Sequence, residues 1–229
     1  MVIAIVVILG SIAMYVPAPH FYRFVMGPIA HIFGDQPMVL LNPFETFTLR
    51  FKVALYATLV VGSPIIIWQV MAFFLPALKA NERRWLIPTF IAMVVLFVGG
   101  VVFAHQIILS TAFEWIVGQA WEGVTQMPEA STYFSGATLL LLGFGMGFQL
   151  PVIVFYLMIF NIVPYHKLRK NWRVAYLAMS VVSASATPDW SPVTMLALFA
   201  ALVALYEMSM GLARVVLAKR IARQKALGY

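Results

Sequence analysis

The sequence predicts an all-α, polytopic membrane protein with a single transmembrane domain over residues 1–229. Hydrophobic residues make up 63% of the chain and charged residues only 10%, and the mean hydropathy is +0.94. This is far more apolar than a soluble globular domain. Each crossing of a hydrocarbon core about 30 Å thick takes about 20 apolar residues. The apolar runs therefore leave room for five or six crossings and for no soluble module.

Composition also excludes several classes of function. Cysteine is absent, so disulfides, thiolate metal sites and thiol nucleophiles are excluded. The histidines show no metal-ligand spacing, and we find no Ser/His/Asp arrangement, phosphate loop or dinucleotide fingerprint. We therefore predict no enzymatic activity, cofactor or metal. The net charge is +7, but the Lys and Arg residues cluster near predicted helix ends, as the positive-inside rule expects, so we predict no nucleic-acid partner.

The first predicted span covers residues 1–16, which are short for a full crossing. A signal peptide would carry a basic leader and a small-residue cleavage site, and neither is present. We therefore expect a transmembrane helix that begins abruptly, with upstream sequence missing or the start misplaced. The Pro and Gly residues in 17–37 predict short interfacial helices over 21–33, outside the cytoplasm. Asn42-Pro43 opens the next element.

The second predicted span covers residues 46–71. Glu45 lies in the first turn of its helix, where a carboxylate suits the helix dipole. Arg50 and Lys52 lie near the outer end, where long side chains can reach the membrane interface. Pro64 removes a backbone hydrogen bond in the middle of the run, so we expect a kink there.

The third predicted span covers residues 85–105, and we expect the helix to continue to Val117. Residues 106–132 contain acids but no Lys or Arg, which is typical of a non-cytoplasmic loop. The fourth predicted span covers 133–160. Its glycines are spaced to allow close approach of neighbouring helices; they are Gly136, Gly143, Gly145 and Gly147.

The fifth and sixth predicted spans cover residues 174–186 and 193–212. The fifth is only about 20 Å long at 1.5 Å per residue, so the bilayer thins there or flanking polar residues dip into it. The segment 161–173 and the C-terminal tail are both basic and are therefore predicted to be cytoplasmic. Six crossings place both termini inside the cell.

Glu82 is the first candidate site residue. It lies in the segment 73–84, which joins the second and third spans and is rich in aromatic and apolar residues. A carboxylate that is partly desolvated there would favour a guanidinium partner. The alternative is a solvated cytoplasmic loop, in which the arginines obey the positive-inside rule and Glu82 pairs locally.

Three further polar residues have two interpretations each. Gln149 lies near the centre of the fourth span, where its amide either joins neighbouring helices or offers a polar contact to another transmembrane helix inserted beside it. Glu207 either reaches the interface and pairs with Arg214 or has a functional role. Asp189 reads first as a turn residue.

Residues 62–78, GSPIIIWQVMAFFLPAL, followed by Asn81-Glu82-Arg83-Arg84, closely resemble the signature of the TatC family, the core subunit of the twin-arginine protein translocase. The likeness extends through residues 144–151 and 186–189 and covers nearly the whole chain. The resemblance implies a six-helix, cup-shaped receptor in the bacterial inner membrane with both termini in the cytoplasm. Such a receptor recognises the paired arginines of signal peptides on folded cargo and uses the proton-motive force.

The resemblance also implies roles for individual residues. Glu82 corresponds to a principal signal-peptide contact, with the positions of Phe73, Pro76 and Arg84 nearby. The last two helices and the positions of two further residues, Pro28 and Asp189, bear on assembly with the partners TatA and TatB. The family also implies several copies of the chain in one complex.

Two departures from the family pattern affect these expectations. The family normally begins with a His-Leu-x-Glu-Leu-Arg-like segment that supplies a second recognition carboxylate, and this chain starts after it. The position of Gln149 is commonly Glu, and an amide keeps hydrogen bonding but loses the charge.

Two rival functions stay open at this point. A small-molecule or ion permease would bind near the midplane, and such proteins usually carry interior ionisable residues and inverted repeats. A passive assembly scaffold would tolerate neutralisation of Glu82 and its neighbours.

Overall fold

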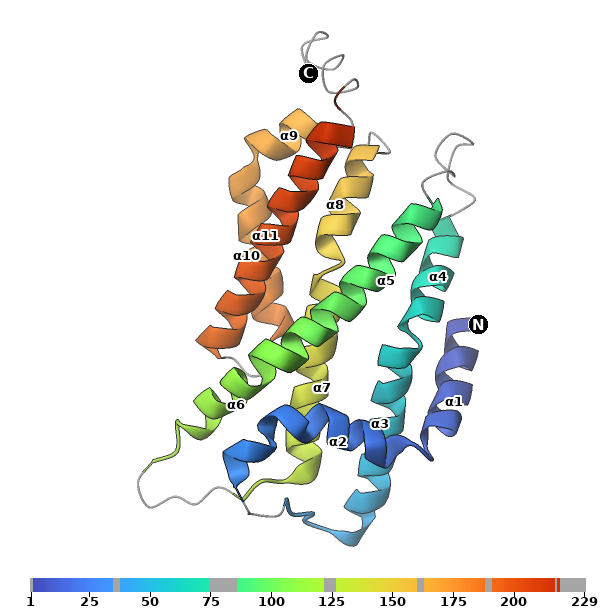
Figure 1. Ribbon diagram of the computed structural model, residues 1–229, viewed down its shortest axis with the longest axis vertical. Helices are drawn as coiled ribbons and strands as arrows, with labels where there is room; N and C mark the ends of the chain where they lie inside the picture. The colour runs from blue at the N-terminus through green and yellow to red at the C-terminus, as the bar shows by residue number, and fades with distance from the viewer. Residues whose placement is uncertain are drawn as a thin grey trace.

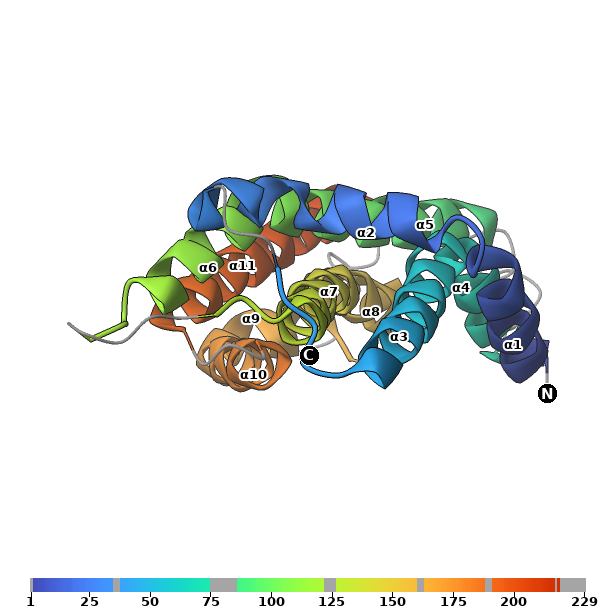
Figure 2. The same ribbon diagram turned by 90° about the horizontal axis from the view of Figure 1, so that it is seen from below.

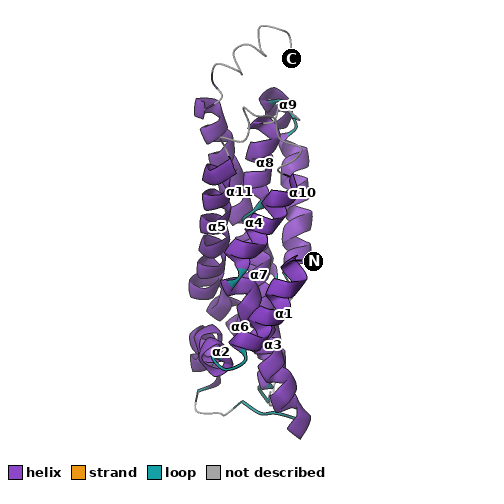
Figure 3. Cartoon of the chain, turned by 90° about the vertical axis from the view of Figure 1, so that its right-hand side faces the viewer, coloured by secondary structure: helices purple, strands orange, loops and turns teal. Residues whose placement is uncertain are grey.

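The computed structural model describes residues 2–34, 38–74, 86–121, 127–159, 163–187, 191–216 and 218. Over these ranges the chain is helical (Figure 3) and has no β-strand, only an isolated parallel bridge between Val39 and Glu129. The predicted all-α fold is confirmed.

The helices form an elongated bundle (Figure 1). We call one end of the bundle the α9 end; it contains α9 and the C-terminal part of α11. We call the opposite end the α2 end; it contains α2 and the beginnings of α3 and α7. In chain order the helices are α1 (Val2–Met14), α2 (Ala18–Met26), the 3-10 helix η1 (Gly27–Phe33), α3 (Pro43–Val61), α4 (Ser63–Phe74), α5 (Leu86–Phe103), the π-helical turn η4 (Ala104–Ile108), α6 (Leu109–Val117), α7 (Ala130–Gly147), α8 (Leu150–Ile159), α9 (Tyr165–Lys170), α10 (Trp172–Ala186) and α11 (Pro192–Val216).

Three helical stretches among the described residues are long and apolar enough to cross a membrane. They are Leu86–Val117, Ala130–Ile159 and Pro192–Val215. Two bent pairs, α1 with the α2–η1 segment and α3 with α4, bring the number to five if each pair is one span. The helix after α5 does reach Val117, so the acidic segment predicted as a loop over 106–132 is helical in its first part.

The short predicted fifth span corresponds to α10, which has 15 residues. At 1.5 Å per residue it is about 22 Å long, which is less than a hydrocarbon core of about 30 Å. It begins at Trp172, two residues before the predicted boundary. Its shortness is confirmed.

The beginning of α3 is fixed by a capping box. The main-chain N–H of Glu45 donates to Asn42 Oδ1 at 2.9 Å, and the Asn42 N–H donates back to Glu45 Oε2 at 3.4 Å. Glu45 Oε2 also accepts the N–H of Leu41 at 2.6 Å. Together these bonds satisfy donors that a helix terminus leaves unpaired. Glu45 therefore stabilises the start of α3 through hydrogen bonds as well as through its charge at the helix N-terminus.

The kink predicted near Pro64 is confirmed, and the break itself lies at Gly62. The axes of α3 and α4 differ by 58°. A Cβ at Gly62 would lie 2.5 Å from the carbonyl oxygen of Thr58, so only glycine fits this turn. Pro64 follows in the first turn of α4, where its missing N–H costs nothing.

α7 is the central helix, and Figure 2 shows it surrounded by other helices when seen from the α2 end. Its glycines allow close approach, as predicted. A Cβ on Gly143 would lie 2.5 Å from the carbonyl oxygen of Ala186 in α10. A Cβ on Gly100 of α5 would lie 3.1 Å from Gly145 Cα. The backbones of α5 and α10 therefore pack directly against α7.

α2 does not run along the bundle. The chain turns by 90° between α1 and the α2–η1 segment, and α2 then lies across α3 and α7 (Figures 1 and 2). Its buried residues are Ala18, Val25 and Met26. This orientation agrees with the predicted interfacial helices.

Candidate functional site

Most of the predicted recognition segment lies outside the described residues. This applies to Pro76, Glu82 and Arg84, and also to Asp189. Phe73, near the end of α4, is described, and its side chain is 79% exposed. The structure brings the end of α4 and the beginning of α5 together at the α9 end of the bundle (Figure 1).

The same end carries a cluster of basic residues. α9 holds Lys167, Arg169 and Lys170 in its last turn, and Arg214 lies in the last turn of α11. The described residues at the opposite end include the acids Glu114 and Glu129. This asymmetry follows the pattern from which the orientation was predicted.

A groove of about 610 Å³ runs between α4, α5 and α7. Its lining is almost entirely apolar, and none of the described residues that line it has an ionisable side chain. The groove is lined by Leu59, Ser63, Ile66, Ile67, Val70, Met93, Phe97, Leu139, Leu142, Gly143, Met146, Gln149, Ser185 and Ala186.

Gln149 projects into this groove from the turn between α7 and α8. Its Nε2 donates to the carbonyl oxygen of Met93 on α5 at 2.9 Å. Its Oε1 is buried, and none of the described residues gives it a hydrogen bond. One half of the amide thus joins two helices, as predicted, and the other half is buried beside the groove without a hydrogen bond from the described residues.

Ser63 is a second polar group in the groove that sequence reasoning missed. The sequence suggested no role for it beyond its place beside Pro64. The structure buries its side chain, and within the described ranges its Oγ has no hydrogen-bond partner. An unsatisfied buried polar group costs about 1–3 kcal/mol, so a guest that offers a hydrogen bond would be favoured here. A hydroxyl within an apolar run was the available signal.

Glu207 does not pair with Arg214, so that expectation was wrong. Its carboxylate accepts Arg169 Nη1 at 2.8 and 3.0 Å, and it accepts the hydroxyl of Tyr176 at 2.9 Å. The hydrogen bond from Arg169 and the charge of the carboxylate raise the pKa of Arg169. Glu207 therefore links α11 to α9 and α10.

Pro28 lies far from these groups. It is half-buried in the first turn of η1 at the α2 end, whereas Phe73 lies at the α9 end. The structure thus separates Pro28 from Phe73 and does not bring all the predicted residues into one site. Among the described residues no group of three or more His, Cys, Asp or Glu could hold a metal ion.

Comparison with known proteins gives one consistent result. The family model described as "Sec-independent protein translocase protein (TatC)" matches residues 1–200. A TatC of Carboxydothermus hydrogenoformans is 29% identical over 96% of this chain and 90% of its own length. A TatC of Deinococcus radiodurans is 34% identical over 80% of this chain and 67% of its own length.

A solved structure gives the same result for the fold. The crystal structure of the twin arginine translocase receptor TatC in DDM superimposes with a TM-score of 0.77 and 25% identity, covering 91% of this chain and 93% of that one. The match by sequence and the match by fold each cover most of the chain. The chain belongs to the TatC family, and it is a multi-pass membrane component of the Sec-independent protein translocase.

Proposed function

We propose that this chain is the receptor and core subunit that binds twin-arginine signal peptides and helps to move folded proteins across the inner membrane with the proton-motive force. The observation that carries the proposal is the family match over residues 1–200. A similar solved structure is described as a twin arginine translocase receptor. The basic α9 end then faces the cytoplasm with both termini, and α10 completes six spans.

Glu82 is the proposed contact to an arginine of the signal peptide. The segment that contains it joins α4 to α5, whose adjoining ends lie at the α9 end, and the basic residues of that end support a cytoplasmic location. Pairing between a carboxylate and a guanidinium is charge-assisted and directional. Phe73, Pro76 and Arg84 would form the surrounding surface, to which Phe73 contributes an exposed ring.

The groove beside Gln149 is the proposed seat of an apolar helix, either the hydrophobic part of a signal peptide or a partner's single span. Its size and apolar lining suit a helix face. Gln149 and Ser63 line the groove, and a change of side-chain rotamer would bring their unpaired Oε1 and Oγ atoms to such a guest as two polar contacts. This arrangement favours the second interpretation of Gln149 without removing the first.

The proposed partners are TatA and TatB, together with further copies of this chain. Pro28 and Asp189 are the proposed assembly positions. They are carried over from the family, and single substitutions of each with co-purification of the partners would test them.

The decisive experiment compares Glu82→Gln with Glu114→Gln. Glu114 is an exposed acid on α6 at the other end of the molecule, so it serves as the matched control. Photo-crosslinking to a signal peptide with paired arginines should weaken about ten- to a hundredfold for Glu82→Gln, because a hydrogen bond to a charged group contributes about 1.5–3 kcal/mol. Glu114→Gln should bind as the parent does.

A peptide with paired lysines should bind less well to the parent and be less affected by Glu82→Gln, because lysine lacks the planar fork of arginine. Equal crosslinking by the parent and Glu82→Gln would contradict the mechanism. That result would favour a passive scaffold.

A further inference from the structure

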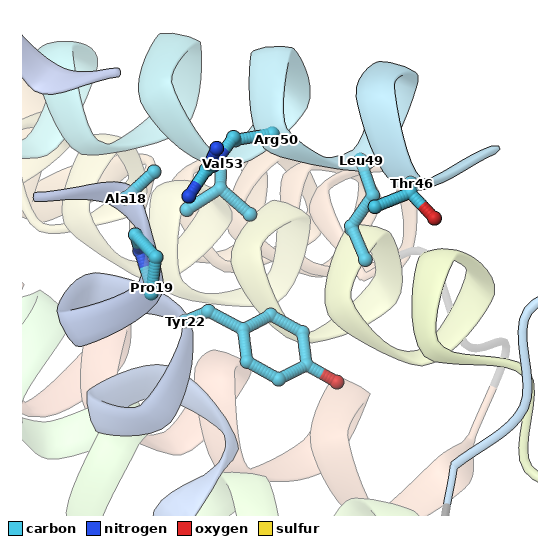
Figure 4. A pocket seen from close by; sticks show the side chains of 7 residues that line it. All are labelled: Ala18, Pro19, Tyr22, Thr46, Leu49, Arg50 and Val53. Atoms are coloured by element: carbon cyan, nitrogen blue, oxygen red, sulfur yellow. The ribbon is translucent and has the colours of Figure 1, made fainter. Parts of the chain in front are cut away.

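A second cavity lies between α2 and α3 at the α2 end of the bundle. Its volume is about 170 Å³, and its apolar wall includes Ala18, Leu49 and Val53 (Figure 4). Among the described residues that line it, Arg50 alone is charged. In Figure 4 the Arg50 side chain reaches from α3 toward α2. The cavity therefore combines an apolar interior with one guanidinium at its edge.

Arg50 has no counter-ion within the described part of the chain. Its guanidinium lies 5.3 Å from the centre of the Tyr15 ring, and no ion pair joins it to an acid among those residues. Glu45, the acid nearest to it in sequence, accepts main-chain N–H groups at the start of α3. Lys52, the other cation of α3, donates to Ser131 Oγ at 3.0 Å. The charge of Arg50 is thus available to a partner outside the chain.

The surroundings of Arg50 indicate the depth at which that partner lies. Phe47 and Phe51 on the same helix are 60% and 48% exposed, and their rings pack edge to face with centroids 4.7 Å apart. Tyr15 packs against Phe51 at 5.2 Å. Tyrosine rings collect at the boundary between lipid headgroups and acyl chains, and the exposed Phe rings beside Tyr15 offer apolar contacts to the acyl chains. Arg50 is therefore held at headgroup depth beside an apolar cavity.

We propose that this cavity is a phospholipid site, with the lipid phosphate on Arg50 and the upper part of one acyl chain in the cavity. A guanidinium matches phosphate oxygens with two parallel N–H donors. The cavity has room for a few methylene groups and offers them apolar contacts on α2 and α3. A free phosphate ion would use only the cation, whereas a phospholipid uses both features.

The proposed lipid would fasten α2 to α3 where the chain turns by 90° after α1. A ligand that binds only the folded protein raises its stability in proportion to its occupancy. An anionic phospholipid should therefore raise the melting temperature of the protein purified in detergent. This inference does not depend on signal-peptide binding, because the cavity lies at the α2 end, whereas α4 ends and α5 begins at the α9 end.

The experiment uses the full chain purified in detergent and titrated with phosphatidylglycerol, with bound lipid counted by native mass spectrometry. Arg50→Gln should bind about fivefold more weakly, because one cation near a membrane surface contributes about 1 kcal/mol toward an anionic lipid. Arg23→Gln is the matched control, since Arg23 is an exposed cation of α2 that does not line the cavity. It should bind as the parent does.

A second variant keeps the test decisive if Arg50→Gln folds poorly. Thr46→Phe places a ring at an exposed residue of the cavity lining without changing any charge, and it should also weaken lipid binding. Unchanged binding by Arg50→Gln, or equal losses in Arg23→Gln and Arg50→Gln, would overturn the site. Displacement of the lipid by millimolar inorganic phosphate would show a general anion site and overturn the lipid assignment.

Discussion

The imidazole Nε2 of His105 lies 2.8 Å from the main-chain carbonyl oxygen of Phe24. A carbonyl oxygen can only accept, so Nε2 carries the proton, and Nδ1 accepts from Gln106 Nε2 at 3.3 Å. His105 is buried, and its ring stacks on that of Phe24 with centroids 4.3 Å apart. The contact satisfies one of the last carbonyls of α2 and fastens this crosswise helix to the π-helical turn η4.

Replacing His105 by alanine should therefore destabilise the protein. The carbonyl oxygen of Phe24 would lose its donor, and a typical intramolecular hydrogen bond contributes about 0.5–1.5 kcal/mol; the packing of the buried imidazole on the Phe24 ring would be lost as well. The measurement is chemical unfolding in detergent followed by circular dichroism. His31→Ala is the control, because His31 pairs with Glu114 at 3.0 Å on an exposed surface, and exposed pairs contribute about 0–1 kcal/mol. Equal losses would contradict the assigned role of His105.

The contact between α7 and α10 predicts that replacing two different glycines by alanine changes the melting temperature in different ways. Gly143→Ala should lower the melting temperature, because its Cβ would lie 2.5 Å from the Ala186 carbonyl oxygen and α10 would have to shift. Gly99→Ala on α5 meets nothing within 4 Å and should be neutral or stabilising by about 0.5–1 kcal/mol. Thermal melting of the two variants side by side checks this, and a neutral Gly143→Ala would count against the close approach.

Glu129, just before α7, should make the stability of the protein depend on pH in the acid range. The hydroxyl of Thr132 donates to Glu129 Oε2 at 2.5 Å. This hydrogen bond, followed by one with the side chain of Glu45 and by the charge of Lys52, lowers the pKa of Glu129 below its ordinary value near 4.5. A lowered pKa gives stability that is present above pH 4.5 and is lost as the pH falls through the folded-state value. Melting temperatures from pH 6 to pH 3 should fall less steeply for Glu129→Gln than for the parent.

The two partners of Glu207 should contribute to stability with different dependence on salt concentration. Arg169→Ala removes an exposed ion pair, so its cost should be under about 1 kcal/mol and should shrink at 1 M salt, where the Debye length is about 3 Å. Tyr176→Phe removes a neutral donor at 2.9 Å, and its cost should change little with salt. Stability curves of both variants at low and high salt would test this. Identical salt dependence would argue against the ion pair.

Gln149→Leu should weaken the binding of a guest helix in the groove. Hydrogen bonds between helices within a membrane contribute about 0.6 kcal/mol on average, so the loss of the bond to Met93 should cost little stability. The loss of Oε1 should reduce the yield of a disulfide between Met146→Cys and a cysteine in the partner helix. The chain has no native cysteine, so such crosslinks are unambiguous. An unchanged yield would remove Gln149 from the proposed contact.

Local chemistry made part of this fold predictable. Backbone geometry within a few residues explains three features. They are the break in the helix at Gly62 and Pro64, the start of α3 at Pro43 and the close approach of neighbouring helices at the α7 glycines. The shortness of α10 follows from counting residues between polar segments. Such features depend on near neighbours in sequence, so the sequence specifies them directly.

Contacts between distant segments could not be predicted in the same way. Glu207 pairs with Arg169, 38 residues away, because the packing of α9 against the end of α11 decides which cation it meets. The burial of Ser63 and the bond from His105 to α2 likewise depend on which helices are neighbours. The surroundings of Glu82 suggested a cation contact and the resemblance to a family made it a signal-peptide contact, while the assembly role of Asp189 came from the resemblance alone; both roles stay predictions because both residues lie outside the described ranges.

The groove beside α7 has a consequence for energetics, because its polar groups are an amide and hydroxyls and none of its lining residues can ionise. A helix with no charges of its own would enter and leave it without taking up or releasing a proton. The membrane voltage does no work on a step that displaces no charge. Docking of such an uncharged helix should therefore be equally strong in energised and de-energised vesicles.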